Sequence, residues 1–217
     1  MAIGAAVAIA RRAPGRAPAL SRGLALIVLA GWIAEQVANV VLGTWSARFN
    51  LPLQLTDAVS LTAVVALWRP RALLVELTYF WALTASLQAT LTPDLAQSFP
   101  SIFFFTYFTY HCGAIVAASL LVFGRGLYPR RRAAWRVFAA TLAFTALAAA
   151  GDLVTGGNYM YLRAKPEHAS LLSVMGPWPW YVVETAVLGL GLLLGLQALT
   201  GVARRRDLAV AGRADLM

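Results

Sequence analysis

The 217-residue chain is 60% hydrophobic, only 12% charged and carries a formal net charge of +9, with a mean hydropathy of +0.69. This composition is typical of a polytopic membrane protein and excludes an ordinary soluble domain. The arginines lie in short runs between apolar segments, where they act as topology signals and not as a nucleic-acid footprint. We therefore expect membrane lipid as the partner and no nucleic acid, and the oligomeric state stays open.

Cys112 is the only cysteine, which excludes an intrachain disulfide, a cysteine-based metal cluster and a paired-cysteine redox motif. A buried packing thiol is its simplest interpretation. The two histidines, His111 and His168, lack the spacing of a metal site. The sequence therefore predicts neither a metal nor an organic cofactor.

The first 22 residues combine a short apolar run with a basic, proline-rich stretch that ends at Arg22. The apolar run is shorter than the roughly 18 residues that a span needs. Its positive charge follows the run, whereas a signal peptide carries charge before it. Residues 1–22 are predicted to be a basic cytoplasmic or interfacial arm.

Six apolar segments follow, and each must be helical because lipid cannot satisfy backbone polar groups. With the N-terminus in the cytoplasm, only Arg48, Arg163 and Lys165 of the 18 lysines and arginines lie outside, which leaves fifteen inside. The positive-inside rule thus places both termini in the cytoplasm. The predicted fold is all-α, with one six-helix domain over 23–200 and a basic cytoplasmic tail over 201–217. The predicted spans are 23–43, 52–68, 72–92, 101–124, 133–153 and 178–200.

The polar residues of these spans gather in the outer half of the membrane. With a rise of about 1.5 Å per residue, Glu35 and His111 lie roughly 12 to 15 Å below the nearest outer helix end. A second set lies within about 10 Å of that end and consists of Asn39, Thr56, Asp57, Gln88 and Glu184. The inner half offers little beyond Glu76, which is close enough in the chain to pair with Arg69 and Arg71.

Ionisable groups inside a membrane are costly and usually face a bundle interior or an aqueous cavity. The set therefore predicts a polar cavity that opens outward. The alternative is that the polar side chains only hydrogen-bond neighbouring helices as packing contacts.

His111 and Thr56 give the sharpest hypothesis. A neutral imidazole can act as a general base, and a threonine hydroxyl becomes a nucleophile when such a base takes its proton. The depths leave several ångströms between the two residues, which helix tilt would have to close. An interhelical histidine with satisfied hydrogen bonds is the alternative. Cys112 is excluded as a partner because adjacent helical positions point about 100° apart, and His168 beside Glu167 is predicted to be a solvated surface group.

Several short fragments stand out in order along the chain. They are Leu51-Pro52-Leu53-Gln54-Leu55, then SLQATLTPDL (86–95) with Phe99-Pro100, His111 followed by Gly113-Ala114, Gly157-Asn158-Tyr159-Met160, Lys165-Pro166, and Gly176-Pro177-Trp178-Pro179-Trp180. Their order resembles the YwaF-like bacterial integral membrane proteins, from about Leu24 to Thr200. The resemblance implies a multi-pass protein of the bacterial inner membrane.

A more distant resemblance links that family to eukaryotic transmembrane protein 164, which looks like a phospholipid acyltransferase with an intramembrane cysteine and histidine. The resemblance implies that His111 is the histidine and that the cysteine falls near Leu53 to Thr56. Relatives of the YwaF type commonly carry an acidic residue or His, then Leu and Cys, where this chain has Gln54, Leu55 and Thr56. Thr56 therefore either replaces the cysteine or the activity is missing.

The leading hypothesis is an intramembrane lipid acyltransferase or lipid hydrolase that acts on phospholipid acyl chains. Thr56 would accept the acyl group, His111 would be the base, and Asp57, Gln88 or Glu35 would orient it. The expected substrate-binding residues are Glu35, Asn39, Gln54, Gln88 and Glu184. One alternative is a small proton- or cation-coupled transporter, although the sequence shows neither the inverted repeat nor the broken helices that are usual in transporters. Another is a non-catalytic membrane assembly factor.

Overall fold

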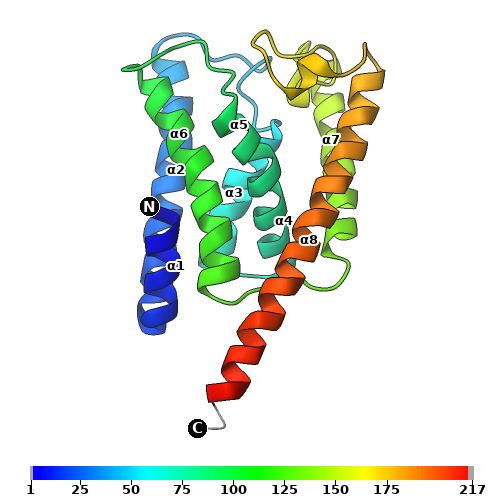
Figure 1. The fold of residues 1–217 in the computed structure, drawn as a ribbon. Coiled ribbons are helices and arrows are strands. Elements are labelled where there is room, and N and C mark those ends of the chain that lie inside the picture. Colours follow the sequence, from blue (N-terminus) through cyan, green and yellow to red (C-terminus); the bar gives the residue numbers. More distant parts are fainter. Residues whose placement is uncertain (1, 215–217) are drawn as a thin grey trace.

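The computed structural model describes residues 2–214, which are helical without any strand in that range. The chain forms α1 (Ala2–Arg12), η1 (Pro14–Arg16), α2 (Ala17–Val41), α3 (Leu55–Trp68), α4 (Ala72–Trp81) with η2 (Ala82–Ser86) and α5 (Leu87–Leu91), α6 (Ile102–Ser119) with η3 (Leu120–Gly124), α7 (Ala133–Thr155), η4 (Tyr159–Tyr161), η5 (Leu171–Val174) and α8 (Trp180–Ala214) (Figure 1). η2 is a π-helical turn between α4 and α5, and η3 is the π-helical last turn of α6. The prediction of an all-α bundle of about six helices is confirmed.

Five of the described helical segments are long and apolar enough to cross a membrane. They are Pro14–Val41, Ala72–Leu91, Ile102–Gly124, Ala133–Thr155 and Trp180–Leu208. The remaining helix, α3, is apolar but has only 14 residues. It begins at Leu55 and not at Pro52 as predicted, because the three preceding residues form a connection that packs on the outer loops and Gln54 is extended.

Both ends of the chain are more helical than the sequence analysis indicated. α1 runs beside the lower half of α2 (Figure 1) and buries Ala6 and Ala10, with Ala10 packed against Gly124 of η3. α8 continues to Ala214, past the predicted end at residue 200, since the segment after Thr200 contains no proline and only two glycines. The described parts of the predicted arm and tail, residues 2–22 and 201–214, are thus mainly helical.

α3 and α4 lie in the middle of the bundle, with α2 and α6 packed on one side of them and the pair of α7 and α8 on the other (Figure 1). α2 and α6 approach closely at two glycines. A methyl group at Gly31 would lie 2.8 Å from Cγ2 of Thr109, and one at Gly113 would lie 2.5 Å from Cγ2 of Val28. Small residues allow such close contact between helices in membranes. This contact sets the distance between α2 and α6.

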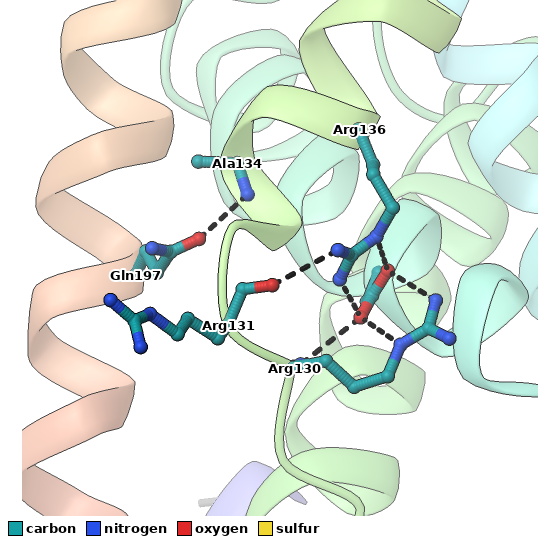
Figure 2. A network of polar contacts seen from close by, with 6 residues as sticks. Arg130, Arg131, Ala134, Arg136 and Gln197 are labelled. Carbon is teal, nitrogen blue, oxygen red and sulfur yellow. Dashed lines mark hydrogen bonds and ion pairs between the residues drawn. The ribbon is translucent and has the colours of Figure 1, made fainter.

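Glu76 anchors α4 to the beginning of α7 at the arginine-rich end of the bundle (Figure 2). Its side chain is 1% exposed and binds the guanidinium groups of Arg130 at 2.9 Å and Arg136 at 2.8 Å. The predicted pairing with Arg69 and Arg71 is therefore wrong. Both of those arginines are exposed in the turn before α4, whereas Glu76 lies one turn further along and points inward.

The connections at the opposite end are tied to one another by side chains. The hydroxyl of Tyr159 donates to the carbonyl of Ala47 at 2.7 Å and accepts from the backbone N–H of Leu51 at 2.9 Å. Asp94 accepts from the hydroxyl of Tyr161 at 2.7 Å and binds Nδ1 of His168 at 2.6 Å. His168 is an exposed surface group, as predicted, but it is paired. These contacts join the connections before α3, before α6 and before α8 into one layer.

Candidate functional site

A polar cluster lies between α2, α3 and α6, on the side of the bundle that carries these tied loops. The carboxylate of Glu35 accepts hydrogen bonds from the hydroxyl of Thr106 at 3.2 Å and from that of Tyr110 at 3.3 Å. Oδ1 of Asp57 accepts from Nε1 of Trp32 at 2.9 Å. Trp32 and Glu35 are three residues apart and share one face of α2. Each carboxylate thus receives hydrogen bonds from uncharged donors.

Asp57 and Glu35 meet the same face of α2, because Asp57 binds Trp32, one helical turn before Glu35. The buried Tyr110 links Glu35 to His111, since its hydroxyl donates to Glu35 and its ring packs on the imidazole. Within the described side chains, neither carboxylate forms an ion pair with an arginine, a lysine or a histidine. The cluster therefore places two acidic groups in the bundle interior without a cation to balance them.

His111 is 2% exposed and lies between two tyrosine rings of its own helix. Its ring centre is 4.1 Å from that of Tyr107 and 4.4 Å from that of Tyr110. Nδ1 is 2.8 Å from the carbonyl oxygen of Tyr107. Because a carbonyl oxygen can only accept, Nδ1 carries the hydrogen and the lone pair of the neutral ring is on Nε2. The local helix geometry thereby selects the tautomer in which Nε2 can act as a base.

The sequence of α6 places these groups by helical spacing. Ser101 caps the helix by accepting from the backbone N–H of Phe103. Thr106 and Tyr110 are four residues apart and reach Glu35 together, and Tyr107 and His111 are four residues apart on the adjacent face. One helix therefore supplies both the hydrogen-bond donors for Glu35 and the imidazole.

Thr56 is the second residue of α3 and is partly buried. Its carbonyl accepts from the hydroxyl of Ser60 at 2.8 Å. In the described part of the chain, Thr56 forms no hydrogen bond with His111. The structure thus brings Glu35, Asp57 and His111 into one cluster, with Thr56 adjacent in sequence to Asp57.

The other predicted binding residues each form a hydrogen bond with a different part of the chain. Asn39 donates to the carbonyl of Glu35 at 3.0 Å, and Gln88 donates to the hydroxyl of Thr92 at 2.7 Å. The side chain of Gln54 accepts from the backbone N–H of Met160 at 2.8 Å. Glu184 is exposed and accepts from the backbone N–H of Gly176 at 3.0 Å. These four side chains do not share one site, although they lie at similar depths.

A cavity of about 310 Å³ lies between η2, α5, α7, α8 and the loop that contains η4 and η5, and Leu55 is the residue of α3 that it reaches. Its walls are mainly aliphatic and aromatic, with Gln88 and four threonines as the polar exceptions. The volume is at the lower end of those of small-molecule sites, and an apolar lining with few polar groups is typical of them. Leu55, next to Thr56, forms part of the wall, whereas Glu35, Asp57 and His111 do not.

The sequence analysis missed the neutral partners of the cluster. Two of them are a helical turn from a predicted residue: Trp32 is three residues from Glu35, and Tyr107 is four residues from His111. That spacing is the one signal that could have identified them. The other two, Thr106 and Tyr110, reach Glu35 across helices.

The sequence analysis also missed Asp94, which binds Tyr161 and His168 in the outer loops. Burial, and then the Asp94 carboxylate, raise the pKa of Tyr161 in the outer layer. Across the described residues, no three or more His, Cys, Asp or Glu side chains are arranged to hold a metal ion.

The fold and the cluster define a class of protein: an all-helical membrane bundle with a buried histidine and two partly buried carboxylates between three helices. The model of the TMEM164 family matches residues 1–196, and the chain therefore belongs to the TMEM164 family. The relation to transmembrane protein 164 expected from the sequence is confirmed at this level. No curated protein and no solved structure matches the chain.

Proposed function

We propose that this member of the TMEM164 family is an intramembrane enzyme that transfers or hydrolyses a phospholipid acyl chain. The observation that carries the proposal is the environment of His111. Its Nδ1–H is bound to the Tyr107 carbonyl, which leaves Nε2 as the basic atom in a ring that is 2% exposed. The apolar cavity of about 310 Å³, which reaches Leu55 next to Thr56, has the lining that an acyl chain requires.

In this mechanism Nε2 of His111 takes the proton of the Thr56 hydroxyl as its oxygen attacks the ester carbonyl. The ester bond then breaks, and the lysolipid oxygen leaves with the proton from His111. Water, or the hydroxyl of a second lipid, subsequently removes the acyl group from Thr56. Water gives hydrolysis and a lipid hydroxyl gives transfer. Glu35 accepts from the hydroxyl of Tyr110, whose ring packs on the imidazole, and in this mechanism Glu35 and Asp57 supply the negative charge that balances the ring as it becomes an imidazolium.

The test is turnover of a phospholipid with a labelled acyl chain by purified protein. We expect His111→Ala to lose activity by a factor of at least about 100, the range of general-base contributions. His168→Ala is the matched control, since it removes the other histidine, on the exposed surface. Equal turnover by the wild type and His111→Ala, or no turnover by either, would remove the proposal.

Thr56 is tested separately because relatives of the YwaF type carry cysteine near this position. Thr56→Val keeps the shape and removes the hydroxyl, and we expect it to abolish formation of the acyl-enzyme. Thr56→Cys should restore an acyl-enzyme, now as a thioester that hydroxylamine cleaves. Thr109→Val is the control, because the Thr109 hydroxyl binds only the Phe105 carbonyl of its own helix. Full activity in Thr56→Val would assign the nucleophile to water and not to Thr56.

A second candidate function follows from a different observation, the two carboxylates without a cation. Glu35 and Asp57 are held by neutral donors in the bundle interior, an arrangement that is typical of proton relays and cation sites. Proton or cation flux into liposomes that is lost in Glu35→Gln and retained in His111→Ala would favour a transporter over the enzyme.

We further infer that the chain is a YwaF-like bacterial member of the family, in the inner membrane with both termini in the cytoplasm. The ordered fragments and the fifteen-to-three distribution of basic residues support this assignment. A reporter enzyme that is active only outside the cytoplasm, fused after residue 217, should be inactive. The same reporter inserted in the loop after Glu167 should be active.

A further inference from the structure

A second cavity lies at the arginine-rich end of the bundle, away from the histidine cluster. It measures about 480 Å³, is open to the surface and is lined by η1, η3 and residues of α1, α2 and α8. Its apolar walls include Pro14, Pro18 and Phe123. Its charged groups are Arg11, Arg125 and Asp207. None of these residues takes part in the proposed enzymatic site.

Arg11 already has an anionic partner in this cavity. Its Nη2 binds Oδ2 of Asp207 at 2.8 Å, and its Nε donates to the Phe123 carbonyl at 2.7 Å. The same Asp207 oxygen also accepts from the hydroxyl of Tyr128 at 2.5 Å. Arg11 and Asp207 therefore balance each other, and they join α1 to α8.

Arg125 is the group left without a counter-charge. It is partly buried, and its Nη1 donates a long hydrogen bond of 3.4 Å to the hydroxyl of Ser21. No carboxylate of the described side chains pairs with it. A guanidinium presents five N–H donors in a planar fork, and a partly buried one without an anion is costly. The cavity therefore has one positive charge to be balanced and donors free to bind an anion.

We propose that this cavity binds the phosphate of a phosphodiester monoanion, as in an anionic phospholipid headgroup. The fork of Arg125 matches the geometry of two phosphate oxygens. The net charge of +1 matches one negative charge, and the Asp207 carboxylate disfavours a dianion. The proline and phenylalanine walls suit the glycerol and first acyl carbons. A basic cavity at the arginine-rich end also faces the membrane surface where anionic lipids attract basic groups.

The experiment uses the full-length protein in a non-ionic detergent that contains no phosphate. Four probes are added separately: a short-chain phosphatidylglycerol, a short-chain phosphatidylcholine, a diacylglycerol and inorganic phosphate. Binding is measured by native mass spectrometry and by the shift in thermal unfolding midpoint. We expect phosphatidylglycerol to bind, diacylglycerol not to bind, and phosphatidylcholine to bind more weakly. A response to inorganic phosphate that equals the response to phosphatidylglycerol would identify free phosphate and not a lipid as the source.

Arg125→Gln should weaken phosphatidylglycerol binding by about tenfold to a hundredfold, the effect of losing one charge-assisted contact. Arg131→Gln is the matched control, an exposed arginine at the same end of the bundle that does not line the cavity, and it should bind as the wild type does. Asp207→Asn removes the competing carboxylate and should bind phosphatidylglycerol more tightly than the wild type. A general loss of structure cannot produce that increase.

Equal binding by the wild type and Arg125→Gln would overturn the proposal, as would equal binding of diacylglycerol and phosphatidylglycerol. If Arg125→Gln does not fold, Arg125→Lys keeps the charge without the planar fork and should bind several-fold more weakly than the wild type. Wild-type affinity in Arg125→Lys together with unchanged affinity in Asp207→Asn would likewise overturn it.

Discussion

Replacement of Glu76 by glutamine tests whether one buried carboxylate joins α4 to α7. Glu76 accepts five hydrogen bonds: three from Arg130, through its backbone N–H, Nε and Nη2, and two from Arg136, through Nε and Nη2. The donor–acceptor distances run from 2.8 to 3.2 Å. Glutamine keeps the shape but removes the charge and turns an NH2 group toward these donors. The substitution therefore leaves two guanidinium groups facing a neutral amide.

The magnitude follows from the exposure of the partners. Removing one member of a fully buried ion pair costs about 3 to 5 kcal/mol. Here the carboxylate is 1% exposed, but the Arg130 and Arg136 side chains are 54% and 37% exposed and can regain water. The cost is therefore lower, and we expect Glu76→Gln to reduce the free energy of unfolding by about 2 kcal/mol.

The assay is an unfolding titration with dodecyl sulfate in mixed micelles, followed by tryptophan fluorescence. Glu167→Gln is the control, because Glu167 is an exposed carboxylate in the outer loop, and its effect should stay within about 0.5 kcal/mol. The loss in Glu76→Gln should also persist at high salt, since a buried group is little screened. A loss below about 0.5 kcal/mol, or one that salt removes, would refute the reasoning.

Three further predictions concern packing and hydrogen bonds in the loops. Gly157→Ala should destabilise the protein by about 1 to 3 kcal/mol, because the new methyl group would lie 2.7 Å from the backbone oxygen of Arg48; Gly195→Ala, with open space around it, should not. Tyr159→Phe should cost about 1 to 3 kcal/mol in the same titration, since its hydroxyl serves two backbone groups. Burial, and then the Asp207 carboxylate, raise the pKa of Tyr128. The difference in free energy of unfolding between the wild type and Tyr128→Phe should therefore be constant below pH about 10. It should fall as the pH rises above that value.

Helix positions were predictable because each span is a long apolar run bounded by prolines, glycines or arginines. α4 starts at Ala72 and α3 ends at Trp68, as expected. The partner of Glu76 was not predictable. Nearness in the chain favoured Arg69 and Arg71, but the actual partner depends on which helices are neighbours, and the connection to α7 brings Arg130 and Arg136 there. A local pattern cannot encode that contact.

The sequence singles out the residues of the polar cluster by type and by estimated depth, but it does not give their lateral positions. Glu35, Asp57 and His111 are recognisable because ionisable groups are rare inside a membrane. Depth is one coordinate only. Gln54 and Glu184 lie at similar depths but turn toward the outer loops, where each accepts a backbone N–H. Side-chain direction depends on helix rotation, which close packing such as that at Gly31 and Gly113 fixes.

The family fragments have a structural explanation that the sequence did not reveal. The Leu51–Leu55 fragment contacts the Gly157–Met160 fragment in the outer layer. The backbone N–H of Leu51 donates to the hydroxyl of Tyr159, and the backbone N–H of Met160 donates to Gln54. The later fragment that includes Trp178 donates from its indole to the Leu162 carbonyl. Much of what makes these fragments recognisable therefore serves the loop layer that covers the apolar cavity.

Both cavities lie where a transmembrane helix departs from regular α-helical geometry. η2 supplies Thr84 and Ala85 to the apolar cavity and ends at Ser86, whose buried hydroxyl lacks a partner among the described residues. η3 supplies Phe123 and Gly124 to the basic cavity, and the Phe123 carbonyl there accepts from Arg11. A π-helical turn inserts a residue and changes which groups face the neighbouring helices, and such turns are frequent at functional sites. Because hydropathy cannot distinguish a π turn from an α turn, neither cavity could be located from the sequence.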